Sequence, residues 1–178
     1  GIIGMAELTL ESDLTPEQHH NVDIIHRSST TLLSILNNIL NFSKLESGKF
    51  SLDERIFNLT DLINNIDAPF QYELQRKQLN LIKNIDPDIP SRLYGDDNYL
   101  RQILLNLIGN SIKFTESGHV TLSVKVENLS NNGVTLQFSI TDTGIGISNK
   151  KMQRLFEPFS QGDFSMTRKY GGTGLGLV

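Results

Sequence analysis

The sequence contains no cysteine among its 178 residues. A disulfide framework, a thiolate zinc site and a cysteine nucleophile are therefore excluded. Long apolar runs are also missing, because the longest unbroken one is Ile103–Leu105, and we expect neither a membrane-spanning segment nor a signal peptide in these residues. The charges form no block of one sign, and 16 Lys and Arg against 20 Asp and Glu give a net charge of −4. This balance argues against nucleic acid or an anionic membrane surface as the main partner.

The composition is that of an ordinary folded chain, with 38% hydrophobic and 20% charged residues. Compared with roughly 150 residues per domain, the length predicts one full domain and an appendage. The pattern begins at Gly1 and stops at Val178 without a natural boundary. We interpret the sequence as a piece of a longer protein.

A long amphipathic helix is predicted from Pro16 to Ser47. Thr15 is suited to cap it, with Gln18 three residues later as the second half of a capping box, and Gly48 to end it. Its apolar stripe follows steps of three and four residues: Val22, Ile25, Ser29, Leu32, Leu36, Ile39 and Ser43, widened by Leu33 and Leu40. Residues 1–12 resemble the end of a preceding helix, which predicts an antiparallel hairpin. Because nothing in the hairpin covers this stripe, we expect it to dimerise into a four-helix bundle.

The rest of the chain mixes strand and helix patterns. Expected strands are Phe50–Leu59, Leu79–Ile85, His119–Glu127 and Val134–Thr141, and expected helices are Leu59–Gln78, Asp96–Phe114 and the short Lys150–Phe156. The last two strands are separated by a hairpin loop and should pair antiparallel. This order predicts an α+β fold, a two-layer sandwich with helices on one face of a mixed sheet.

Three elements suggest nucleotide chemistry, and the first follows a predicted strand. Asp142 is followed by Gly144 and Gly146, a pattern that allows a carboxylate to accept a hydrogen bond from the amine of a flat base. A strand-ending turn capped by Asp142 explains the same residues, and taken alone it is the better explanation.

The second element is the glycine-rich segment Gly171–Leu177. Its backbone N–H groups, at the start of a helix, are suited to bind phosphates. No Gly-Lys-Ser or Gly-Lys-Thr follows, which excludes a Walker A loop, and no strand directly precedes it, which excludes a Rossmann fingerprint. The alternative is a flexible linker.

The third element lies on the predicted helix Asp96–Phe114. Asn106 and Asn110 are four residues apart and share one face, with Lys113 one turn further along. Two amides and an ammonium group in this arrangement are suited to hold Mg²⁺ and a triphosphate. The alternative is that the two asparagines only bond neighbouring backbone.

Together, in this order, the three elements resemble the Bergerat-type ATP-binding domain of sensor histidine kinases. The segment Leu100–Thr115 looks like the N box of that family, and Asp142–Ile147 looks like its G1 box. Leu155–Gln161 resembles the F box, and Thr167–Leu177 resembles the G2 box. Residues 1–48 are similar to part of the dimerisation and histidine-phosphotransfer hairpin of hybrid kinases. The resemblance therefore divides the chain into this hairpin and a catalytic ATP-binding domain, residues 49–178, expected to be truncated at its C-terminus.

The resemblance implies a set of roles for these residues. Asp142 would bind the adenine amine, Gly144 and Gly146 would make room for the base, and Asn110 would ligate Mg²⁺. Asn106 would contact metal or phosphate, and Lys113 would contact the phosphates. Phe156 and Phe159 would anchor a lid that runs from about Ser160 to Tyr170. The remaining implied contacts are Arg168 and Lys169 toward the γ-phosphate, and Gly172, Thr173, Gly174, Leu175 and Gly176 in the phosphate loop.

The family transfers the γ-phosphoryl group of Mg-ATP to a histidine, which would lie before Gly1. His19, His20, His26 and His119 do not match that position. We therefore expect a histidine kinase core that does not phosphorylate itself when this piece is alone. Implied partners are a second copy of the chain and a response-regulator receiver domain, without nucleic acid and without membrane contact by these residues. A cytoplasmic location is implied for this portion, and membrane anchoring of the longer protein stays open.

Two other functions are considered. Chaperone-like, mismatch-repair and topoisomerase ATPases use a similar ATP-binding scaffold but carry a glutamate where Asn106 stands, and an amide is no general base. A nucleotide-sensing scaffold without catalysis is the second alternative.

Overall fold

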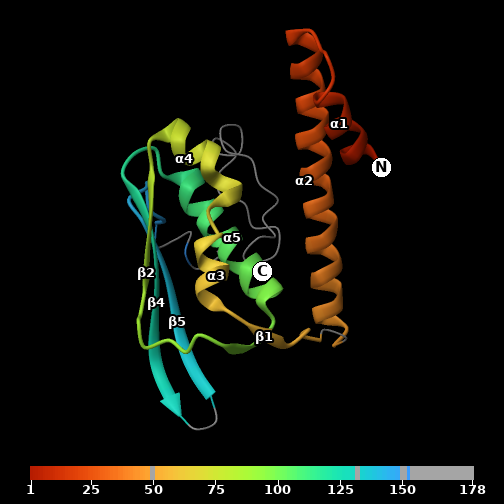
Figure 1. The fold of residues 1–178 in the computed structure, drawn as a ribbon. Helices are drawn as coiled ribbons and strands as arrows, with labels where there is room; N and C mark the ends of the chain where they lie inside the picture. Colours follow the sequence, from red (N-terminus) through yellow and green to blue (C-terminus); the bar gives the residue numbers. More distant parts are fainter. Residues whose placement is uncertain (49–50, 131–132, 149–151, 153–178) are drawn as a thin grey trace. The chain divides into compact units, whose positions relative to one another are not determined.

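The computed structural model describes residues 1–48, 51–130, 133–148 and 152. Two compact units are present, one containing residues 1–48 and the other residues 51–148. Figure 1 shows their elements, and each unit is described by itself. No helix in the described part of the chain is long and apolar enough to cross a membrane.

The first unit is a hairpin of α1 (Ile2–Leu10) and α2 (Pro16–Glu46), as predicted. The capping box is present: the Thr15 N–H donates to Gln18 Oε1 at 3.0 Å, and the Gln18 N–H donates to Thr15 Oγ1 at 3.3 Å. Ala6 of α1 is buried, and His26 Nε2 lies 3.3 Å from Glu7 Oε1, which joins α2 to α1. The two helices therefore contact each other through a small apolar group and a polar pair.

The apolar stripe of α2 faces solvent in the single chain. Ile25, Leu32, Leu36 and Ile39 are 50%, 57%, 49% and 41% exposed. Polar pairs lie elsewhere on the helix, such as Arg27 with Asp23 one turn earlier. Clustered exposure of this kind is typical of a surface that another helix covers.

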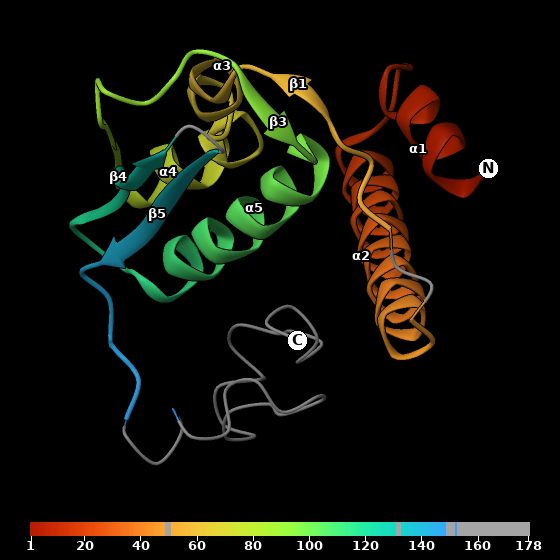
Figure 2. The same cartoon turned by 90° about the horizontal axis from the view of Figure 1, so that it is seen from below.

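The second unit contains two sheets and a layer of helices. Its elements are β1 (Arg55–Phe57), α3 (Leu59–Asn64), the 3-10 helix η1 (Ala68–Phe70), α4 (Gln71–Lys77), β2 (Asn80–Ile85), β3 (Leu93–Gly95), α5 (Asp97–Phe114), β4 (His119–Ser130) and β5 (Gly133–Asp142). The larger sheet has the order β2-β4-β5, with β2 parallel and β5 antiparallel to β4. Helices α3, α4 and α5 lie on one face of it, which Figures 1 and 2 show from two sides. The predicted α+β sandwich with a mixed sheet is confirmed.

The core lies between the sheet and the helices. Alternate residues of β4, namely Val120, Leu122 and Val124, are fully buried, and Phe138 and Ile140 of β5 lie opposite the last two. The helices contribute buried side chains to the same cluster: Leu59, Leu62 and Ile63 of α3, Leu74 of α4, and Leu104, Ile108 and Ile112 of α5. Alternation along the strands and a period of 3.6 along α5 therefore produce one continuous apolar layer.

Two predicted elements differ from the structure. The strand expected at Phe50–Leu59 is limited to β1, which pairs antiparallel with β3, a short strand that the sequence analysis did not predict. The single helix expected at Leu59–Gln78 is broken into α3, η1 and α4. Pro69 lies in the break and lacks a backbone N–H, so an uninterrupted helical ladder cannot form there. The helix expected at Lys150–Phe156 falls outside the described residues, apart from Met152.

Helix α5 begins at Asp96, whose carboxylate accepts hydrogen bonds from two segments. Asp96 Oδ1 accepts the Tyr99 N–H at 3.0 Å as an N-cap, and Oδ2 accepts the Asp53 N–H at 2.8 Å from the segment before β1. The hydrogen bonds from Tyr99 and then from Asp53 hold the pKa of Asp96 below its ordinary value of 3.8. A depressed pKa means that the folded state favours the charged form.

We expect the substitution Asp96→Asn to reveal this preference as a pH-dependent loss of stability. Asparagine keeps a capping oxygen but not the charge, so the variant should melt at a lower temperature at neutral pH. Because the folded pKa lies below the unfolded one, the difference should shrink as pH falls through the folded pKa. Thermal melts followed by circular dichroism across this range measure it. Asp88→Asn, at an exposed carboxylate, is the control; equal pH profiles for both variants would contradict the prediction.

Candidate functional site

Helix α5 has two opposite faces with different chemistry. Leu104, Ile108 and Ile112 are buried in the core. At 100° per residue, Asn106, Asn110 and Lys113 point to the other side of the helix, where all three are half-buried. The structure therefore confirms that these polar side chains share one face, and it separates them from the packing face of the same helix.

Lys113 is the cation of this face. Burial lowers the pKa of its ammonium group below the ordinary lysine value. The Nζ atom lies 5.2 Å from the centroid of the Phe114 ring, within the range of a cation–π contact. Because part of its water shell is already lost in the folded chain, this ammonium group is well suited to an anionic ligand.

The C-terminal end of α5 is bonded to several other segments. Lys77 Nζ, on α4, donates to the carbonyl oxygens of Ile112, Lys113 and Thr115 at 2.7, 3.0 and 2.9 Å. The buried Thr115 hydroxyl donates to the Ser111 carbonyl oxygen at 2.7 Å. These contacts satisfy carbonyls that a helix end would otherwise leave without partners.

Asp142 ends β5 on the helix-facing side of the sheet. It stands opposite Val120 in the β4–β5 register, two residues after Ile140 in the same alternation. Asp142 Oδ1 accepts the Gly144 N–H at 2.9 Å, which is the local turn that the sequence allowed as an alternative. The Oδ2 atom accepts no hydrogen bond from the residues that the structure describes, and the side chain is exposed. The turn is therefore present, and it uses only one of the two carboxylate oxygens.

The loop after Asp142 lies against the end of α5. The Ile145 N–H donates to the Phe114 carbonyl oxygen at 3.4 Å. A Cβ atom on residue 144 would lie 2.5 Å from the same oxygen, so only glycine allows this approach. The structure therefore connects the loop of Asp142 directly to the helix of Asn110 and Lys113.

Thr143 fixes the other side of this loop. Its hydroxyl oxygen accepts the His119 N–H at 3.1 Å, and the hydroxyl donates to the Ser117 carbonyl oxygen at 3.1 Å. Sequence analysis singled out neither Thr143 nor Lys77. Both act through hydrogen bonds to backbone of distant segments, which no local pattern reveals.

Part of the predicted site falls outside the residues that the structure describes. Phe156, Phe159, Arg168, Lys169, Gly172, Thr173, Gly174, Leu175 and Gly176 all lie outside the described residues. Gly146 is described and has a positive φ of 68°, a conformation that favours glycine. Of the predicted set, the structure therefore describes Asn106, Asn110, Lys113, Asp142, Gly144 and Gly146.

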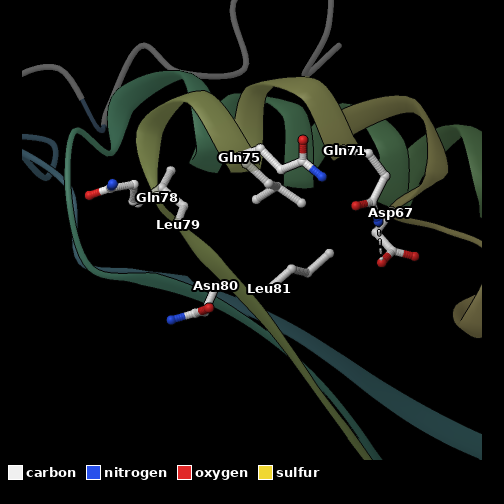
Figure 3. Close-up of a pocket in the computed structure, with 8 residues that line it drawn as sticks. Asp67, Gln71, Gln75, Gln78, Leu79, Asn80 and Leu81 are labelled. Atoms are coloured by element: carbon white, nitrogen blue, oxygen red, sulfur yellow. Dashed lines mark hydrogen bonds between the residues drawn. The ribbon is translucent and has the colours of Figure 1, made fainter.

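A separate hollow of about 380 Å³ lies between α4 and β2 (Figure 3). Gln71, Gln75 and Gln78 border it from the helix side, and Asn80 and Leu81 border it from the strand, while Gln71 donates to Asp67. None of the six described site residues lines it. The candidate site is therefore defined by the polar side chains of α5 and the loop after Asp142, and it is separate from this hollow.

Two family models match the chain. Residues 1–48 match the model of the "His Kinase A (phospho-acceptor) domain". Residues 95–178 match the model of the "Histidine kinase-, DNA gyrase B-, and HSP90-like ATPase". The chain belongs to the histidine kinase family. Both resemblances expected from the sequence are thereby confirmed.

Curated relatives of the chain are sensor and hybrid histidine kinases by name. It is 44% identical over its whole length to the signal transduction histidine-protein kinase BarA of Escherichia coli, and 44% identical to the sensor histidine kinase GacS of Pseudomonas protegens. It is also 44% identical over 99% of its length to the hybrid signal transduction protein dokA of Dictyostelium discoideum. The chain spans 19%, 19% and 11% of these proteins, respectively.

Solved structures agree with the fold. Full-length ShkA in complex with AMPPNP is similar with a TM-score of 0.73 and 31% identity, over 99% of this chain and 35% of that one. The histidine kinase AdeS of Acinetobacter baumannii gives a TM-score of 0.67 at 19% identity, over 99% of this chain and 80% of that one. At 19% identity, the similarity to AdeS supports only the fold of the chain.

We expect Gly144→Ala to destabilise the second unit and to disturb the candidate site. The new methyl group would overlap the Phe114 carbonyl oxygen and come within 2.9 Å of Asp142 Oδ1, so the loop must move, at a cost of about 1–3 kcal/mol. Chemical denaturation measures this loss. Gly95→Ala is the control, because a Cβ there meets only a Phe57 ring carbon at an ordinary 3.7 Å. Equal losses for the two variants would argue against the close approach.

Proposed function

We propose that this chain is the catalytic core of a two-component or phosphorelay histidine kinase. It binds Mg-ATP in the second unit and transfers the γ-phosphoryl group to a histidine. The observation that carries the proposal is the bond between the Phe114 carbonyl and the Ile145 N–H, which joins the helix of Asn110 and Lys113 to the loop of Asp142. One ligand with a base at one end and phosphates at the other suits that combination of groups.

The roles proposed for the described residues follow from their chemistry. Asp142 accepts a hydrogen bond from the adenine amine through Oδ2, because Oδ1 is used by the Gly144 N–H. Gly144 and Gly146 allow the base to approach the backbone. Lys113 and Asn106 contact phosphate oxygens. These roles rest on the family and on the placement of the residues within the second unit.

Magnesium fits the same face of α5. The amide oxygen of Asn110 is a hard ligand of the type that Mg²⁺ prefers, and Mg²⁺ commonly takes its other ligands from water and substrate phosphates. No group of three or more His, Cys, Asp or Glu side chains suited to hold a metal ion occurs within the described ranges. The donor set therefore suits an ion that arrives with the nucleotide. When bound, the ion neutralises charge on the phosphates.

The proposed transfer needs little covalent chemistry from the protein. An imidazole nitrogen of the acceptor forms a bond to the γ-phosphorus while the bond to the β–γ bridging oxygen breaks and ADP leaves. Asn106 stands where related ATPases carry a glutamate, and an amide cannot take a proton from water, so phosphotransfer is favoured over hydrolysis. His19, His20 and His26 of α2 are not the proposed acceptors, which we place before residue 1.

The partners are proposed on the same basis. The exposed stripe of α2 suits a second copy of the hairpin, as in a four-helix bundle. A receiver domain is the proposed next carrier of the phosphoryl group, in line with relatives named hybrid signal transduction proteins. A cytoplasmic location is proposed for this portion, because ATP is supplied there.

Nucleotide binding tests the proposal through Asp142→Asn. The variant replaces an acceptor-only carboxylate with an amide that can turn a donor toward the adenine amine, which should weaken binding by about 1–3 kcal/mol. Titration of the chain with a fluorescent ATP analogue and Mg²⁺ measures the affinity. Asp88→Asn makes the same change at an exposed position away from the site and should leave the affinity intact. An unchanged affinity in Asp142→Asn would remove Asp142 from the site, and no binding by the native chain would refute the function.

Dimerisation is tested by Leu36→Lys. Leu36 is 49% exposed in the single chain and lies in the middle of the stripe, so a lysine would place an unpaired ammonium group in the proposed apolar interface. Analytical ultracentrifugation should show a dimer for the native chain and a monomer for the variant. Thr31→Lys adds the same charge about 140° away around α2 and should remain dimeric. A native chain that stays monomeric at high micromolar concentration would contradict the bundle.

A further inference from the structure

Lys77 is a cation whose ammonium group is bonded to backbone carbonyls of another helix. It lies in the last turn of α4, in a part of the chain that neither family model matches. Its ammonium group donates to three backbone carbonyls of another helix end, at 2.7, 3.0 and 2.9 Å. Three bonds use all three of its donors. Lys77 therefore acts entirely on the end of α5.

The bonded carbonyls belong to residues on both sides of Phe114. Those of Ile112 and Lys113 precede it, and that of Thr115 follows it. The Phe114 carbonyl itself accepts the Ile145 N–H and lies so close to residue 144 that only glycine fits. The Phe114 carbonyl oxygen therefore lies between two sets of contacts. Lys77 bonds to the carbonyls before and after it, and the loop after Asp142 bonds to the oxygen itself.

We propose that Lys77 is a positioning residue for base recognition. Its ammonium group fixes the last turn of α5, which holds the 142–146 loop in the conformation in which Asp142 Oδ2 meets an adenine amine. This inference rests on the proposed function and extends it, because it assigns adenine selectivity to a residue that does not touch the nucleotide. Without the ammonium group, three carbonyls lose charge-assisted hydrogen bonds, and the helix end and the loop relax together.

The test compares two nucleotides that differ in the base. Guanine has a carbonyl oxygen where adenine has its amine, so a carboxylate acceptor at Asp142 should favour ADP over GDP. Isothermal titration with Mg-ADP and with Mg-GDP gives the ratio of the two dissociation constants. Lys77→Met keeps an unbranched apolar side chain and removes the ammonium group, and we expect it to reduce the ratio about fivefold or more.

Lys83→Met is the matched control. Lys83 Nζ also donates to a backbone carbonyl, that of Asn64 at 2.9 Å, and it pairs with Asp67 Oδ1 at 2.7 Å, but these contacts do not involve α5 or the Asp142 loop. The control should lower the melting temperature and leave the ratio unchanged. A loss of stability alone would weaken both nucleotides equally, so the ratio separates positioning from folding.

The outcomes are distinct. If the native chain binds neither nucleotide, the proposed function fails, and this inference fails with it. If the native chain prefers ADP and Lys77→Met keeps that preference, or if Lys83→Met loses it equally, only the role of Lys77 is refuted. Should Lys77→Met not fold, NMR of the lysine ammonium groups in the native chain decides: Mg-ADP should shift the Lys77 signal and leave that of Lys83 in place, and an unmoved Lys77 signal refutes the role.

Discussion

The need of the carbonyl groups at the end of α5 for partners outside the helix is the constraint on which the second unit depends. A helix leaves its last carbonyls without internal partners, and buried polar groups without partners are costly. Ser111 and Thr115 are buried here, so water has little access to hydrogen-bond the carbonyls at this end of the helix. The Thr115 hydroxyl, the Lys77 ammonium group and the Ile145 N–H supply the partners. Because these come from three segments, satisfying one helix end also joins α4, α5 and the loop after β5.

The same helix carries two functions on opposite sides. Leu104, Ile108 and Ile112 hold it against the sheet, where Val120, Leu122 and Val124 complete the layer. Asn106, Asn110 and Lys113 project from the other side and are not part of the buried cluster. A rigid helix fixed along its whole buried length sets the spacing of the polar groups on its free side. Packing in this unit thereby determines the geometry that a phosphate or a metal ion would meet.

Strong local patterns made much of this structure predictable. Three patterns were sufficient to predict their elements: the capping box at Thr15, the period of α5, and the alternation of β4 and β5. The last three elements are long and have one buried face, so their periods are easy to recognise. The short pair β1 and β3 was only partly predicted, since three-residue strands have too few residues to show a period. The stretch 59–78 kept helical spacing across Pro69, and spacing alone does not reveal a break. The motifs indicate Asn106, Asn110 and Asp142 as candidate site residues, whereas Lys77 bonds to backbone far away in sequence and lies in no motif.

The two units also differ in what stabilises them. The second buries a continuous apolar cluster within one chain. Of the side chains described in residues 1–48, Ala6 is the buried apolar one, while Ile25, Leu32 and Leu36 are about half exposed. Apolar surface contributes roughly 25 cal/mol per Å² only when it leaves water, so the hairpin gains little of this free energy by itself. In the proposed dimer, its stability would rise with protein concentration, whereas the second unit buries its apolar cluster within one chain.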